Sequence, residues 1–285
     1  MSVVAFLPDR LLTHVRDVFD AEPDFVVAKS WDDVDAIVRQ TPVTAVILDP
    51  DADGSMNVEA VELLLNRFPS LSIVAYVSLS QQSFCAMARL ARAGLQNVLL
   101  QRFEDSPREF REMVERARKN PLKKKFVEEL QPQLKLLPLK LLSIVDDMLD
   151  SPHCYHTVQD IALRAEISAL KLYRAFSVAR LGSPRRFLNA VKVLNAVGYL
   201  QDRGYSVADV ARKVGYRNSR ILADHTLDVF GLTPSIVRSH VAPEDAVARL
   251  ITWLRNQPTK DMDQRRRFKY VSKENVIRRS HRSLI

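Results

Sequence analysis

Two neighbouring side chains, Tyr173 and Arg174, have the types and the placement to recognise another molecule. Apolar residues recur at helical spacing around them, as at Leu172 and Phe176, and leave both on the opposite face of the helix. An arginine on such a face can pair with guanine through two hydrogen bonds, worth about 1–3 kcal/mol of discrimination between base pairs. A solvated helix surface is the plainer alternative. The residues expected on this face are Ala169, Leu170, Tyr173, Arg174 and Ser177.

A second segment, YRNSRILADHTLDVFG from Tyr216, has the same layout and offers Arg220. One turn further along its outward face lies Asp224, which phosphates repel but which can accept a hydrogen bond from a cytosine amino group. Either this segment reads a cytosine, or it contributes mainly backbone contacts while the first segment sets specificity. We favour the second interpretation. The candidate residues here are Ser219, Arg220, Ala223 and Asp224.

Both segments belong to an internal repeat. VQDIALRAEIS from Val158 returns as VADVARKVGYR from Val207, 49 residues later, and each copy reads as a short helix, a break and a second helix. The break falls on Glu166 in the first copy and on Gly215 in the second. Because glycine accepts the positive φ of such turns, we expect the Glu166 turn to be wider or strained. Each copy ends with similar punctuation, LGSP from Leu181 and GLTP from Gly231.

Two such units joined by a long helix closely resemble the DNA-binding domain of the AraC/XylS family. The resemblance implies an all-α double helix-turn-helix domain whose second helices enter successive major grooves about 34 Å apart. It also implies a bacterial transcription regulator with double-stranded DNA and RNA polymerase as partners. Thr226 and Leu227 depart from the family's usual Phe-Lys pair. The matching residues are Ile161-Ala162, Ser168, Leu172, Arg174, Phe176, Gly182-Ser183-Pro184, Val210-Ala211, Val214-Gly215-Tyr216, Gly231-Leu232-Thr233-Pro234-Ser235 and Arg238.

The first half of the chain has a different rhythm, in which short apolar runs alternate with amphipathic helical segments. This order predicts an α/β domain over residues 1–120, with a parallel sheet of about five strands and sites at the strands' carboxyl ends. Five segments are expected to form the strands: VVAFL from Val3, DFVVAKS from Asp24, VTAVIL from Val43, LSIVAYV from Leu71 and NVLL from Asn97.

This half resembles the flavodoxin-like receiver domain of two-component response regulators. Asp49 ends the third strand, where the family places its phospho-acceptor, and Ser78 fits the family's hydroxyl. Only Asp9 remains of the acidic pair that helps to hold Mg²⁺, and Gln101 replaces the usual lysine. We therefore expect a pseudo-receiver used for signal sensing or dimerisation. The alternatives are a working, phosphorylation-controlled receiver with Mg²⁺ at Asp9 and Asp49, or an Asp49 that merely caps a loop.

The join between the halves, residues 121–140, contains three consecutive lysines and three prolines and reads as a linker with one short amphipathic helix. Its apolar stripe either pairs two copies of the chain or packs on its own domain. The DNA-binding domain is expected over residues 141–242, and residues 243–285 as an extra helix with a basic tail. The linker stripe consists of Phe126, Val127, Leu130 and Leu134, and the stripe of the extra helix consists of Val247, Leu250, Ile251 and Leu254.

Charge separates the halves further. Residues 1–120 hold 13 Lys and Arg against 18 Asp and Glu, whereas residues 121–285 hold 29 against 16, so the second half is suited to a polyanion. We find no leader after Met1, no apolar run that could span a membrane and no catalytic or metal-ligand constellation. We therefore expect a cytoplasmic, non-enzymatic protein without a cofactor. A further alternative is an interaction adaptor whose degenerate helix-turn-helix no longer reads DNA.

Overall fold

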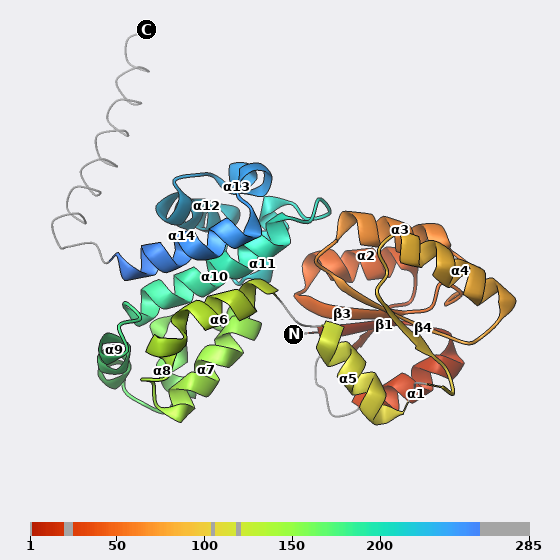
Figure 1. Ribbon diagram of the computed structural model, residues 1–285, viewed down its shortest axis with the longest axis horizontal. Coiled ribbons are helices and arrows are strands. Elements are labelled where there is room, and N and C mark those ends of the chain that lie inside the picture. Colours follow the sequence, from red (N-terminus) through yellow and green to blue (C-terminus); the bar gives the residue numbers. More distant parts are fainter. Residues whose placement is uncertain (1, 20–24, 104–105, 118–120, 257–285) are drawn as a thin grey trace, which may run out of the picture.

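The computed structural model describes residues 2–19, 25–103, 106–117 and 121–256, and the chain forms a sheet-containing part beside a helical part (Figure 1). The N-terminal part holds the expected five-stranded sheet, in the order β2-β1-β3-β4-β5, with every neighbouring pair parallel. The strands are β1 (Ser2–Phe6), β2 (Phe25–Val27), β3 (Val43–Leu48), β4 (Ser72–Val77) and β5 (Asn97–Leu100).

Helices cover both faces of this sheet (Figure 1). Successive side chains of a strand point to opposite faces, so Val3 and Ala5 pack with α1 and α5, while Val4 and Phe6 pack with α2, α3 and α4. Burial on both faces explains why the strands are almost entirely apolar. The helices are α1 (Asp9–Phe19), α2 (Trp31–Gln40), α3 (Val58–Arg67), α4 (Gln81–Arg92) and α5 (Pro107–Ala117).

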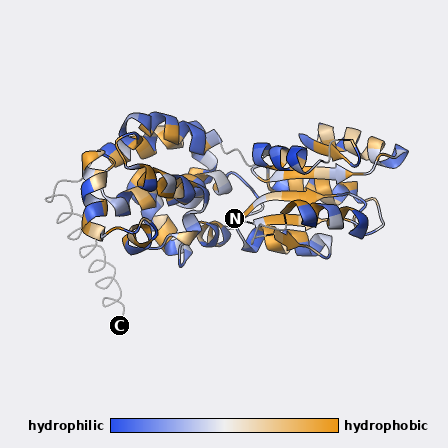
Figure 2. Cartoon of the chain, turned by 90° about the horizontal axis from the view of Figure 1, so that it is seen from below, coloured by the Kyte–Doolittle hydropathy of each residue, from blue (hydrophilic) through white to orange (hydrophobic). Residues whose placement is uncertain are grey.

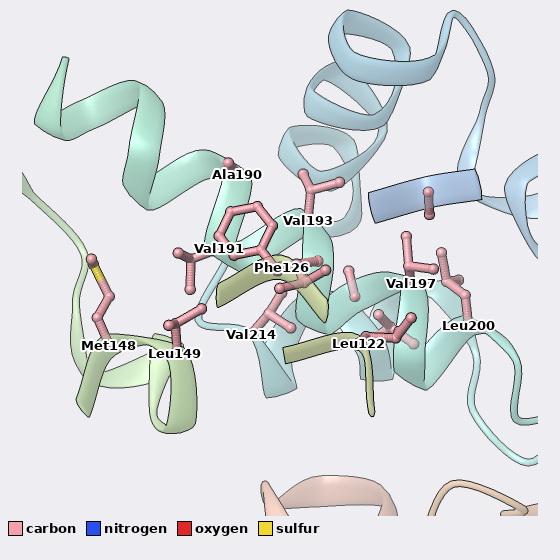
Figure 3. Close-up of a cluster of buried hydrophobic side chains, with 14 of the residues drawn as sticks. Leu122, Phe126, Met148, Leu149, Ala190, Val191, Val193, Val197, Leu200 and Val214 are labelled. Atoms are coloured by element: carbon pink, nitrogen blue, oxygen red, sulfur yellow. The ribbon is translucent and has the colours of Figure 1, made fainter. Parts of the chain in front are cut away.

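The helical part is built around α10, whose 17 residues contact helices on several sides. Figure 3 shows Val191, Val193 and Val197 of this helix meeting Phe126 of α6 and Met148 of α7 in one apolar cluster. The elements are α6 (Pro121–Leu134), α7 (Leu139–Asp150), the 3-10 turn η1 (Pro152–Cys154), α8 (Val158–Arg164), α9 (Ala169–Val178), α10 (Pro184–Leu200), α11 (Val207–Lys213), α12 (Ser219–Phe230), α13 (Pro234–His240) and α14 (Pro243–Arg255).

The segment expected as a linker, residues 121–140, is instead an integral part of this domain. The expected amphipathic helix is present as α6, which continues through Pro132, and its Phe126, Leu130 and Leu134 are buried against α10 and α14. Of the two roles for this stripe, packing on its own domain is the one found. An internal proline costs about 3 kcal/mol, but each fully buried Leu or Phe contributes about 1.5–3 kcal/mol, so packing outweighs the lost helix bond.

Helix α14 packs on the same domain, as expected from its apolar stripe. The Arg186 guanidinium lies 3.6 Å from the centroid of the Trp253 ring, and its Nε donates to the Trp253 carbonyl at 3.2 Å. The basic run at residues 265–282 lies outside the described residues. Figure 2 shows that hydrophobic residues are concentrated on the strands of the sheet and alternate with hydrophilic ones along the helices. None of the described helices combines the length and the hydropathy needed to span a bilayer.

Candidate DNA-binding interface

The first helix-turn-helix unit consists of α8 and α9. Thr157 begins α8 with a capping box, since its hydroxyl accepts from the Asp160 backbone N–H and the Asp160 carboxylate accepts from the Thr157 backbone N–H. At the start of α9 the Ser168 hydroxyl accepts a single cap bond from the Lys171 backbone N–H. The turn between the helices passes through Glu166 at φ +54°, a left-handed conformation that side chains rarely adopt. This confirms the expectation of strain.

The second unit, α11 and α12, repeats these local devices. Ser206 and Asp209 form the capping box of α11, and Asn218 caps α12 through Ile221 N–H. Gly215 makes the turn at φ +77°, and a Cβ on it would lie 2.6 Å from the Cα of His153. Glycine is therefore required here for both its conformation and its size.

The outward face predicted on α9 is present in the structure. Leu170 is 60% exposed and Tyr173 is 43% exposed, although both are large and partly apolar, while Arg174 and Ser177 are also exposed and Ala169 is half-buried. Among the described residues no carboxylate forms an ion pair with Arg174. This face can therefore offer a guanidinium, a phenol and an aliphatic side chain to a ligand at the same time.

The face on α12 carries both signs of charge. Ser219, Arg220 and Asp224 are exposed and Ala223 is half-buried. Thr226, where the family usually has phenylalanine, is fully buried, and its hydroxyl donates to the Ala223 carbonyl at 3.0 Å.

A polar network beneath α12 escaped the sequence analysis. The Nδ1 atom of His225 lies 2.8 Å from the Tyr216 hydroxyl and its Nε2 lies 3.4 Å from the Asn189 amide nitrogen. Lys192 donates to the carbonyl of Gly215 at 2.9 Å, and burial lowers its pKa to about 8. Burial also lowers the pKa of His225. These groups fix the turn and the helix of the second unit from below, and no spacing in the sequence announces them.

The candidate phospho-acceptor site lies at the carboxyl ends of the strands. Asp49 is only 3% exposed and accepts from Asp51 N–H at 3.0 Å, and burial raises its pKa. Ser78 donates to the Gln101 side-chain oxygen at 2.7 Å. Asp9 is exposed in the first turn of α1. Within the described ranges no three His, Cys, Asp or Glu residues are grouped as a metal site.

Residues 161–240, which contain most of both units, match the helix-turn-helix domain family. This part of the chain is an AraC-type helix-turn-helix domain. The lactose operon transcription activator of Staphylococcus xylosus is 24% identical over 119 residues, which are 42% of this chain and 43% of that protein. The chain thus matches less than half the length of this curated relative.

Two solved structures also resemble the chain. Full-length FixJ from B. japonicum has a TM-score of 0.35 and 12% identity, covering 65% of this chain and 92% of that one. The xylose-binding transcription activator xylR has a TM-score of 0.33 and 14% identity, covering 83% of this chain and 69% of that one. The AraC-type domain is therefore assigned from the sequence match, and the receiver-like architecture from the sheet itself.

Proposed function

We propose that this chain is a sequence-specific DNA-binding transcription regulator in which α9 supplies most of the base readout. The observation that carries the proposal is the exposed Arg174, beside Tyr173 and Leu170, on the second helix of an AraC-type unit. A guanidinium with no carboxylate partner among the described residues is free to make a bidentate pair in the major groove. Transcription activation, the role of the similar lactose operon activator, is in keeping with this proposal.

For the second unit we propose mainly backbone contacts. Asp224 is exposed on the outward face of α12, where it repels phosphates, while Arg220 on the same face can contact them. Readout of a cytosine by Asp224 is the alternative, because a carboxylate can accept from the cytosine amino group.

Selection of bound fragments from random DNA tests the proposal. The wild-type chain is expected to enrich a motif with an invariant G·C pair, and Arg174→Ala is expected to lose the preference at that pair alone. Arg249→Ala, which removes an exposed arginine from α14, serves as the charge-matched control. No enriched motif, or an unchanged motif with Arg174→Ala, would contradict the proposal. A palindromic motif would also show that two copies of the chain bind together. Contact with RNA polymerase is implied only by the resemblance to the family.

For the sheet domain we propose a pseudo-receiver that acts through contact rather than through phosphorylation. The bond between Ser78 and Gln101 supports it, because it engages the hydroxyl that would meet a phosphoryl group. Asp9 alone also offers few ligands for Mg²⁺. The buried Asp49 at the end of β3 favours the alternative of a phosphorylation-controlled regulator, and in that case Asp49 and Asp9 would hold the ion.

An interaction adaptor is the competing proposal from another class, and the exposed Asp224 on α12 is the observation that favours it. The two are separated by the salt dependence of DNA binding. A reader of DNA releases counterions and loses affinity steeply as salt rises, whereas an adaptor shows neither motif nor salt dependence. As a DNA-bound regulator the chain would act in the cytoplasm without a cofactor.

A further inference from the structure

The loop between α10 and α11 projects toward α2 and α3 of the sheet domain (Figure 1). Its Asp202 accepts from the Ser70 backbone N–H at 2.8 Å and also from the Ser70 hydroxyl, and its Gly204 N–H donates to the Arg67 carbonyl at 2.8 Å. Asp202 has no exposed surface. The loop that precedes the second helix-turn-helix unit is thus bonded to the last residue of α3 and to the segment that follows it.

Beside these bonds the two domains are in close contact around Phe68. The Phe68 ring is fully buried, and its centroid lies 4.7 Å from that of Tyr205. A Cβ on Gly204 would lie 2.2 Å from the nearest atom of the Phe68 ring. Because real side chains do not approach so closely, a residue larger than glycine must displace the buried Phe68 ring or move the two domains apart at this point.

A buried lysine forms the other half of the contact. Lys213, at the end of α11, is 1% exposed, and its ammonium group donates to the Thr41 carbonyl at the end of α2. The same ammonium lies 4.6 Å from the ring centroid of Tyr205 and 5.2 Å from that of Tyr199. The carboxyl end of a helix favours a cation, so α2 is suited to hold α11 in this way.

We propose that this contact between the domains is a regulatory latch through which the sheet domain positions the second helix-turn-helix unit on DNA. We call the contact the seam; it consists of Thr41, Arg67, Phe68 and Ser70 on one side and of Asp202, Gly204, Tyr205 and Lys213 on the other. Helix α11 belongs to that unit and contacts both α2 and α12. The candidate residues Arg220 and Asp224 are exposed while the seam is closed. The closed seam therefore does not cover them, and it acts by setting the place of α11 and α12 relative to α9.

This inference rests on the proposed DNA binding. The seam would affect the free energy of that binding by fixing the orientation of the second unit. Helix α10 contacts both units, and the closed seam adds a further support to α11. Without that support, α11 and α12 have more freedom relative to α9, and this freedom must be lost when the two units bind adjacent grooves. A change at α2 or α3 that opens the seam would therefore lower the affinity for DNA. Typical couplings of this kind change affinity by about 5- to 150-fold.

Gly204→Ala in the full chain is the direct test, with two separate measurements. Hydrogen exchange at the Ser70 and Gly204 amides reports opening of the seam whether or not DNA binds, and affinity for the selected DNA reports its consequence. We expect faster exchange and a loss of affinity of at least about fivefold. Gly198→Ala is the matched control, because its Cβ would meet only the Leu122 side chain at 3.8 Å. It should change neither measurement.

Further variants keep the test decisive if Gly204→Ala fails to fold. Ser70→Asp places a second carboxylate against the buried Asp202 from an exposed position, and it should open the seam by repulsion. Combining Gly204→Ala with Phe68→Leu removes the colliding ring and should restore part of the affinity.

The outcomes separate the latch from the proposed function. Faster amide exchange with unchanged affinity, or with increased affinity, overturns the latch. The absence of selective DNA binding by the wild-type chain overturns the proposed function instead, and the exchange measurement still reports whether the seam opens.

Discussion

The Ser78 hydroxyl donates a hydrogen bond of 2.7 Å to the Gln101 side-chain oxygen. These residues follow β4 and β5 directly, on the edge of the sheet where Asp49 follows β3. A receiver would place a hydroxyl and a lysine there to meet a phosphoryl group. In this chain the two side chains satisfy each other, and no cation from this pair faces Asp49.

We therefore expect no phosphorylation of Asp49 by a small phosphodonor in the presence of Mg²⁺. Its pKa is raised by burial, which disfavours the ionised nucleophile, and the neutral Gln101 cannot offset the charge that develops on a transferring phosphoryl group. Mass spectrometry of the intact chain measures the outcome, with Asp49→Asn as the control. A phosphate mass on the wild type that is missing from Asp49→Asn would restore the working receiver.

Substitution of Arg174 should weaken binding to the selected DNA by about 5- to 150-fold, the equivalent of about 1–3 kcal/mol for a lost bidentate pair. Arg174→Lys keeps the charge but presents it as a point without the planar fork, so it should retain phosphate attraction and still lose the preference for guanine. Titration of matched and mismatched duplexes at one salt concentration distinguishes these effects. If Arg174→Lys keeps the wild-type preference, Arg174 contacts phosphate rather than base.

Asp224→Ala should increase affinity for all duplexes by a similar factor, because the substitution removes a negative charge from a face that approaches phosphates. The gain should shrink as salt is raised, since the repulsion is screened over about 10 Å at 0.1 M. Asp228→Ala removes the same charge from the same helix, but at a half-buried position. It should therefore raise the affinity for DNA less than Asp224→Ala does. Relaxed choice at a single base pair, without a general gain, would instead assign Asp224 to cytosine readout.

Much of this architecture could be predicted because its signals are local. Strand burial follows from continuous apolar runs, and the outward face of α9 follows from the apolar residues between which Tyr173 and Arg174 lie. The breaks in the apolar pattern also indicated the turns, including the strained position at Glu166. The helix at α6 was predicted, but its place in a linker was wrong, because Leu130 and Leu134 are buried in the helical domain. The three prolines and three lysines favoured a linker, whereas tertiary burial decides the outcome.

The seam between the domains could not be predicted, because its partners are far apart in sequence and look like ordinary surface residues. Asp202 and Ser70 are 132 residues apart, and Lys213 and Thr41 are 172 residues apart. A lysine at the end of a short helix normally faces water, so its type gives no sign of burial. Only the folded arrangement, in which α2 ends against α11, shows why this one is enclosed.

Glu166→Gly should stabilise the chain relative to Glu166→Ala. Both substitutions remove the ion pair between Glu166 and Lys140, but only glycine relieves the left-handed backbone at φ +54°. That conformation destabilises a residue with a Cβ by about 1–2 kcal/mol. Glycine avoids this strain but loses more conformational freedom on folding, which destabilises the glycine variant by about 0.5–1 kcal/mol. The free energy of unfolding from urea titration should therefore be higher for the glycine variant by about 0.5–1 kcal/mol. Equal stability of the two variants would mean that the turn is unstrained.

The seam should also make stability depend on pH, because two of its ionisable groups, Asp202 and Lys213, are buried and have shifted pKa values. Burial lowers the pKa of Lys213 to about 7 and raises the pKa of Asp202 to about 6. The groups that face Lys213 are Asp202, Asp209, Arg212 and the phenols of Tyr199 and Tyr205. Between about pH 4 and pH 6 the folded chain holds a proton on Asp202 that the unfolded chain releases, so this carboxyl makes stability fall as pH rises.

Above pH 7 the sign reverses, because the unfolded chain keeps a proton on Lys213 that the folded chain has released. The contribution of Lys213 to the free energy of unfolding should therefore increase from about pH 7 to about pH 10. Lys213→Met, which fills similar space without a charge, should lack this increase, and urea titrations of the two chains at pH 7 and pH 9 measure the difference. The Asp202→Asn variant should keep the increase above pH 7 and lose the decrease between pH 4 and pH 6. Parallel pH profiles for the wild type and Lys213→Met would show that Lys213 stays charged in the closed seam, held there by Asp202 and Asp209.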